Sequence, residues 1–189
     1  MILPFFRSLC ESKGVYRLVK EDIKIRTAEL EDAARILQIQ EEVIAEEDFL
    51  TTDSREFFKT VEQQRDWIKK ILQNDREIIL VAEIQNEIVG WLVFLSPGRI
   101  RLSHTGSFGM MIQKDFRGKG IGKSLIKGIL EWAKLNPFIE KVSLGVFSTN
   151  ERAIALYKKM GFIEEGRKIR EFKRNDNEYI DDILMYKFV

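Results

Sequence analysis

At residues 117–122 the chain reads Arg117-Gly118-Lys119-Gly120-Ile121-Gly122, and this stretch decides the interpretation of the whole sequence. A strand-like run, 104–112, precedes it, and a segment with apolar residues at helical spacing, 125–133, follows it. The glycines therefore lie at the N-terminus of a predicted helix. Free backbone N–H groups and the positive end of the helix dipole make such a position suitable for binding phosphate.

Two common phosphate loops do not fit these residues. A Walker A loop needs a glycine five residues before Gly122, and that position is Arg117, although Gly122-Lys123-Ser124 imitates the end of the motif. A Rossmann fingerprint that starts at Gly118 meets Lys123 where its third glycine belongs. The hypothesis that the chain binds ATP is thus supported only by the three residues Gly122-Lys123-Ser124. The missing third glycine disfavours NAD binding.

The pattern that fits is Arg/Gln-x-x-Gly-x-Gly/Ala, which Arg117, Gly120 and Gly122 satisfy. Here the sequence resembles the GNAT superfamily of acyl-CoA-dependent N-acetyltransferases. A second segment, from Asn150 to Phe162, is similar to that family's strand-to-helix segment after the next strand. Both segments occur in the family's order, and the order of predicted elements extends the resemblance over roughly residues 23–189.

The resemblance implies acetyl-CoA as the cosubstrate and no metal. The loop amides would hold the CoA pyrophosphate, while the pantetheine arm would lie where the strand ending at Ile112 splays from the next strand, 141–147. An amide there would polarise the thioester carbonyl. Lys123 would add positive charge near the phosphates. The implied cofactor-binding residues are Met110, Ile112, Arg117, Gly118, Lys119, Gly120, Ile121, Gly122, Asn150 and Tyr157.

Acetyl transfer to an amine needs a proton for the departing thiolate, and the resemblance assigns this donor role to Tyr157. Transfer would be direct, without a covalent enzyme intermediate. The plain alternative is a core aromatic residue, because Tyr157 shares a helical face with Ala153, Ile154 and Met160. Asn150 is also a candidate N-cap for the helix that follows it.

An alkyl ammonium has a pKa near ~10, so a proton acceptor is also needed. The first predicted helix ends in an acidic run, 41–48, where this family commonly builds its acceptor site. Glu47 is the predicted base, with Glu46 and His104 as alternatives. A solvated helix end explains the same residues. Because carboxylates attract cations, we expect a small cationic amine as the acceptor.

Two other functions stay open. In the first alternative, the acceptor is a protein N-terminus or a lysine side chain. In the second, the chain is a non-catalytic acyl-CoA-binding regulatory module that kept only the pyrophosphate loop. Retention of Tyr157 argues against the second of these. A small-molecule amine acceptor remains the predicted partner.

The fold class that we expect is α/β (α+β): a mixed, mostly antiparallel central sheet with helices on both faces, GNAT-like and splayed at the cofactor site. One domain would span 1–189, with an appended arm at 1–14 and a cofactor-binding core at about 104–162. A hairpin would join 15–19 to 23–26, and a helix capped by Asp53 would run to about Asn74. Glycines within the run 104–112 suggest a bulge or the close approach of a ligand.

Composition excludes several classes of partner. The chain has 31 basic and 30 acidic residues, so bulk charge favours neither nucleic acid nor a membrane surface. The charge is uneven, with 14 basic and 19 acidic residues over 1–100 and 17 basic and 11 acidic residues over 101–189. The second half thus suits an anion.

One cysteine and one histidine leave no disulfide framework and few metal ligands, which favours a reducing, cytoplasmic location. The apolar start, 1–9, is interrupted by Pro4 and Arg7, so we expect neither a signal peptide nor a membrane span. A homodimer in which the arm takes part is a further possibility.

Overall fold

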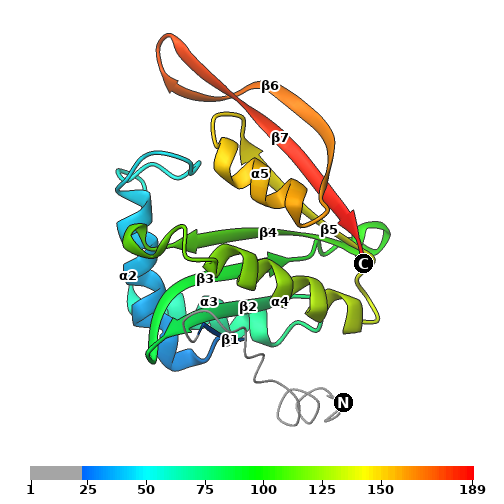
Figure 1. The fold of residues 1–189 in the computed structure, drawn as a ribbon. Coiled ribbons are helices and arrows are strands. Elements are labelled where there is room, and N and C mark those ends of the chain that lie inside the picture. The colour runs from blue at the N-terminus through cyan, green and yellow to red at the C-terminus, as the bar shows by residue number, and fades with distance from the viewer. Residues whose placement is uncertain (1–22) are drawn as a thin grey trace.

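The computed structural model describes residues 23–189 and contains one seven-stranded sheet in the order β1-β2-β3-β4-β5-β7-β6 (Figure 1). The arm at 1–14 and the predicted strand at 15–19 lie outside the described residues. The strands are β1 (Lys24–Thr27), β2 (Ile78–Ile84), β3 (Glu87–Leu95), β4 (Thr105–Ile112), β5 (Lys141–Phe147), β6 (Ile163–Asn175) and β7 (Glu178–Phe188). The helices are α2 (Ala33–Ile44), α3 (Val61–Leu72), α4 (Ile121–Leu135) and α5 (Glu151–Lys159).

Every neighbouring pair of strands is antiparallel except β4 and β5, which are parallel. Helices α4 and α5 cover one face of the sheet and α2 and α3 cover the other (Figure 1). The predicted mixed, mostly antiparallel sheet with helices on both faces is therefore confirmed.

Helix α4 shows why these helices form where they do. Its apolar residues recur every three or four positions, which places Ile121, Leu125 and Ile129 on one face, and all three are buried against the sheet. The helix ends at Leu135, because Asn136 precedes Pro137 and adopts an extended conformation.

The start of α3 corrects one prediction. Asp53 and Glu56 form only a turn, in which the Asp53 N–H donates to Glu56 Oε1 at 3.0 Å. The helix begins eight positions later, where Thr60 and Gln63 cap each other's backbone N–H groups. The second capping pair prevails because the apolar stripe continues from it through Ile68 and Ile71, both buried, whereas Phe58 is 85% exposed.

The C-terminal hairpin is the least buried part of the sheet. Strand β6 has no fully buried residue, and its pairing with β7 is irregular at three places. Phe172 of β6 stacks on Phe147 of β5 at 4.4 Å between ring centroids. At the far end of the hairpin, Arg174 donates to the carbonyl of Asp48 at 2.8 Å and so connects the hairpin to the segment after α2.

Candidate active site

The glycine-rich turn is shaped to leave backbone N–H groups free. Gly118 and Gly120 have φ angles of 85° and 94°, a left-handed conformation that glycine adopts at little cost. Gly120 is the N-cap of α4, and no side chain caps the helix there. A Cβ built on Gly120 would meet no atom within 4 Å. The first amides of α4 therefore face open space.

Gly122 serves a different purpose, because it allows α4 to approach β4 and α5 closely. A Cβ at this position would lie 3.3 Å from Met110 Cε, 3.4 Å from Ile112 Cδ1 and 3.3 Å from Leu156 Cδ2. The Met110 and Ile112 side chains thus pack under α4. Their strand is held in place directly below the N-terminus of that helix.

Strands β4 and β5 separate in the middle of the sheet, as predicted. They pair only from Thr105–Ser107 with Lys141–Ser143, and no pairing joins them beyond Ser107. On its other side, β4 stays paired with β3 as far as Ile112, and β5 stays paired with β7 as far as Phe147. The facing edges of β4 and β5 consequently carry backbone N–H and C=O groups without a strand partner.

These two features fit an acyl-CoA. A pyrophosphate matches the uncapped amides at a helix N-terminus, and the amide groups of a pantetheine arm match the unpaired strand edges. Both features lie on the same side of the molecule, since the loop of 113–120 connects the end of β4 directly to α4 (Figure 1).

Tyr157 is both a core residue and a candidate proton donor. Its ring is 8% exposed and packs edge-to-face on Phe108 at 5.8 Å and on Phe162 at 6.1 Å. Burial raises the pKa of Tyr157 to about 12, so the hydroxyl keeps its proton at neutral pH. This hydroxyl has no hydrogen-bond partner among residues 23–189.

Asn150 caps α5, and its Oδ1 accepts from the N–H of Ala153 at 3.1 Å. The cap uses only the oxygen of the side chain, and within the described part of the chain its NH₂ group meets no acceptor. Capping and a contact with the CoA arm are therefore compatible.

Arg117 does not present a free charge to the loop. Its guanidinium donates to both carboxylate oxygens of Glu46 at 2.6 Å, and its Nε donates to the carbonyl of Ile112 at 2.9 Å. Glu46 and Arg117 are 71 positions apart, so no local pattern in the sequence indicates this pair. Lys119 and Lys123 are exposed cations beside the glycines, and Arg152 Nη2 would lie 3.3 Å from a Cβ built on Gly118.

The acidic end of α2 adjoins this loop. Glu46 is bound to Arg117, and Glu42 accepts from Gln113 Nε2 at 2.7 Å. Glu47 is exposed and accepts from Ser54 Oγ at 2.7 Å. His104 precedes β4 at the opposite end of the strand, about 26 Å along it from Ile112. The structure thus brings Glu42 and Glu46, and not the histidine, next to the segment that carries the glycines, while Glu47 contacts Ser54.

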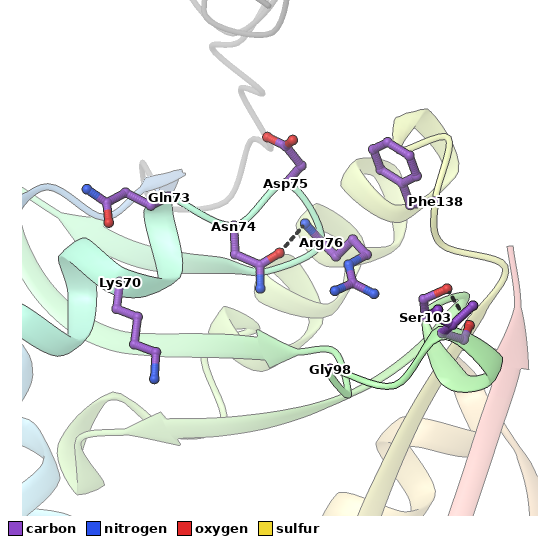
Figure 2. Close-up of a pocket in the computed structure, with 9 residues that line it drawn as sticks. Lys70, Gln73, Asn74, Asp75, Arg76, Gly98, Ser103 and Phe138 are labelled. Carbon is purple, nitrogen blue, oxygen red and sulfur yellow. Dashed lines mark hydrogen bonds between the residues drawn. The ribbon is translucent and has the colours of Figure 1, made fainter. Parts of the chain in front are cut away.

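A groove of about 550 Å³ lies elsewhere, between the α3–β2 turn and the β3–β4 loop (Figure 2). Phe138 lines it at the C-terminal end of α4, which is about 22 Å of helix away from Gly120. Neither Tyr157 nor the glycine loop contributes to this groove. It is separate from the site that the sequence predicts.

Residues 23–189 contain neither a cluster of metal-binding side chains nor a membrane-spanning helix. No group of three or more His, Cys, Asp or Glu side chains is placed to hold a metal ion. No helix in the same range has the length and apolar character that a membrane span requires.

A mixed sheet that opens between two parallel strands, beside an uncapped helix N-terminus, fits an acyltransferase that takes its acyl group from coenzyme A. A family model described as acetyltransferase (GNAT) family matches residues 40–162. The chain therefore belongs to the GNAT family, and it is an acetyl-CoA-dependent N-acetyltransferase.

Several proteins have sequences similar to that of this chain. The uncharacterized N-acetyltransferase YokL of Bacillus subtilis, of SPβ prophage origin, is 27% identical over 86% of this chain and 88% of its own. The L-amino acid N-acetyltransferase AaaT of Escherichia coli is 33% identical over 56% of this chain and 65% of its own. The spermidine N(1)-acetyltransferase of Vibrio cholerae is 30% identical over 62% and 66%, respectively.

Solved structures share the fold. An acetyltransferase of the GNAT family from Streptococcus pneumoniae is 30% identical, with a TM-score of 0.84 over 88% of this chain and 99% of its own. The yncA protein of Salmonella typhimurium, determined with its cofactor acetyl-CoA, has a TM-score of 0.80 over 89% and 94%, at 18% identity.

Proposed function

We propose that this enzyme transfers the acetyl group of acetyl-CoA to the primary amine of a small cationic molecule. The observation that carries the proposal is the position of the acidic run: Glu42 accepts a hydrogen bond from Gln113, in the segment that connects β4 to α4, and the nearby Glu47 is exposed. A cationic acceptor would be attracted to the place where the donor's loop begins. Two of the relatives are named for small primary amines, L-amino acids in one case and the polycation spermidine in the other.

Each part of the donor site has its own task. The amides of 118–122 bind the pyrophosphate, and the free edge of β4 at Met110 and Ile112 pairs with the pantetheine arm. The thioester supplies an activated acetyl group. A backbone N–H of β4 polarises its carbonyl, and Tyr157 holds at Oη the proton that the departing thiolate takes up.

Glu47 remains the predicted acceptor of the amine proton. Its exposed carboxylate at the end of α2 exchanges protons readily with solvent, and it lies one residue from the Glu46–Arg117 pair. A glutamate with solvent access can pass the proton on after each turnover.

The choice of donor is tested first by thermal unfolding. Acetyl-CoA at about a hundred times its Kd should add ~2.7 kcal/mol of stability, a rise in Tm of roughly 5–10 °C for a chain of this size. CoA should act similarly, and ATP and NAD should not. A rise with ATP alone would mean that Gly122-Lys123-Ser124 binds a nucleotide and would overturn the proposal.

The choice of acceptor is tested by thiol release from acetyl-CoA with a panel of amines. We expect kcat/KM to be highest for small cationic amines such as spermidine, and at least about tenfold lower for peptides with a free N-terminus. Acetylation of peptide N-termini alone would contradict the proposal. Acetyl-CoA binding without turnover on any amine would favour the regulatory module instead.

A further inference from the structure

Two glycines face each other across the opening in the sheet. The last β4–β5 pair is Ser107 with Ser143, and two residues further along each strand lie Gly109 and Gly145. Positions two apart on a strand share a face, so both glycines lie on the face of these two serines. No side chain projects from either strand at this point, on the face that α2 and α3 cover elsewhere.

The surroundings of the two glycines differ. A Cβ on Gly109 would meet no atom within 4 Å, so this side of the opening is free. A Cβ on Gly145 would lie 2.8 Å and 3.2 Å from the two carboxylate oxygens of Asp182. The Asp182 side chain, which comes from β7, is therefore directed over β5 toward the opening.

Asp182 is a buried carboxylate with one distant cation partner. The residue is 7% exposed, and among residues 23–189 Lys168 is the one cation that forms an ion pair with it. Its nearest cation is Lys168 Nζ at 3.6 Å, and Lys168 is half exposed and lies closer to Glu171, at 3.0 Å. Because a buried charge is costly unless it is paired, this arrangement suits a cation that arrives from outside the protein.

The two faces of the opening have different access. Tyr157 and Phe108 belong to the core under α4 and α5, so these helices close that face. An amine must therefore reach the thioester from the other face, where the two glycines and Asp182 lie. A side chain at either glycine would obstruct this route.

We propose that Asp182 binds the ammonium group of the acceptor at the opening between Gly109 and Gly145. This assignment rests on the proposed function and names the residue that selects a cationic substrate. It differs from the role of Glu47, which lies at the end of α2 and would accept the proton afterwards. When the acceptor binds, its ammonium group replaces Lys168 as the ion-pair partner of Asp182.

The test compares Asp182→Asn with Lys168→Met. Spermidine serves as the cationic probe and aniline, uncharged at neutral pH, as the control amine. We expect Asp182→Asn to raise KM for spermidine by about 10–100-fold, to leave KM for aniline within about twofold, and to keep the Tm rise with acetyl-CoA. Lys168→Met should leave KM for spermidine unchanged.

Other results would overturn the assignment. If Asp182 only pairs with Lys168, Lys168→Met will reproduce the effect of Asp182→Asn. An unchanged KM for spermidine in Asp182→Asn removes Asp182 from the acceptor site, while the proposed function stands if the wild type acetylates spermidine. If the wild type neither binds nor acetylates any cationic amine, both proposals fail.

Gly109→Val provides a second variant that leaves Asp182 intact. The added side chain has room, since a Cβ there meets no protein atom within 4 Å. It should raise KM for spermidine and for aniline alike by at least about tenfold, with the acetyl-CoA Kd unchanged. Unchanged values for both amines would show that the acceptor does not pass this position.

Discussion

Replacing Tyr157 with phenylalanine should lower kcat by about 10²–10⁴-fold while the Kd for acetyl-CoA stays within about twofold of the wild type. The ring supports the core through Phe108 and Phe162, and phenylalanine preserves that packing. Only the hydroxyl is lost, and this group has no partner within residues 23–189. The Tm should therefore not fall, which separates the chemical role from the structural one.

Steady-state kinetics with the best amine of the panel, together with a thermal scan, provide the measurement. Tyr186→Phe is the matched control, because Tyr186 lies at the closed end of the β4–β5 pair, opposite Ser143. Since burial raises the pKa of Tyr157 to about 12, the wild-type kcat should show no alkaline fall up to about pH 10. An unchanged kcat in Tyr157→Phe would remove Tyr157 from the acid role.

Gly120→Asp should weaken acetyl-CoA binding by roughly 100-fold relative to Gly120→Asn. The two side chains have the same shape, both tolerate a φ of 94°, and both find open space at this position. They differ only in charge. A carboxylate about 5 Å from a phosphate costs about 3 kcal/mol at an effective dielectric constant of ~20.

Isothermal titration of both variants with acetyl-CoA gives the two Kd values. The asparagine variant accounts for backbone strain and for any capping of α4 by the new side chain, so the ratio isolates the electrostatic effect. The Kd ratio should shrink as salt is raised, because exposed charges are screened. Equal affinities at low salt would show that the pyrophosphate does not bind at Gly120.

The parts of the site that are local in sequence could be predicted from it. The glycines of 118–122 and the cap at Asn150 follow from turn and helix chemistry within a few residues. The start of α3 could not, since Asp53 and Thr60 both begin a capping pattern and only tertiary burial of Ile68 and Ile71 decides between them.

Contacts between distant segments also escaped prediction. Glu46 meets Arg117 only because the end of α2 crosses the loop after β4, and Asp182 reaches Gly145 only through the register of β5 with β7. The one local signal for Asp182 is a pair of acidic residues, Asp181 and Asp182, within an otherwise apolar strand pattern, Ile180–Met185. Without the pairing of β5 with β7, the sequence does not show which part of the sheet the Asp182 side chain lies against.

The exposure of the β6 side chains in the β6–β7 hairpin affects how this enzyme can evolve. Most side chains of β6 are exposed, so substitutions there remove few buried contacts and cost little stability. Yet the hairpin stands beside the opening in the sheet, and Arg174 connects it to the segment after α2 (Figure 1). Selection can therefore change the residues of the β6–β7 hairpin to suit new acceptors, while the acetyl-CoA site at the end of β4 and the start of α4 stays constant. A lineage of such enzymes can diversify in substrate without first acquiring extra stability.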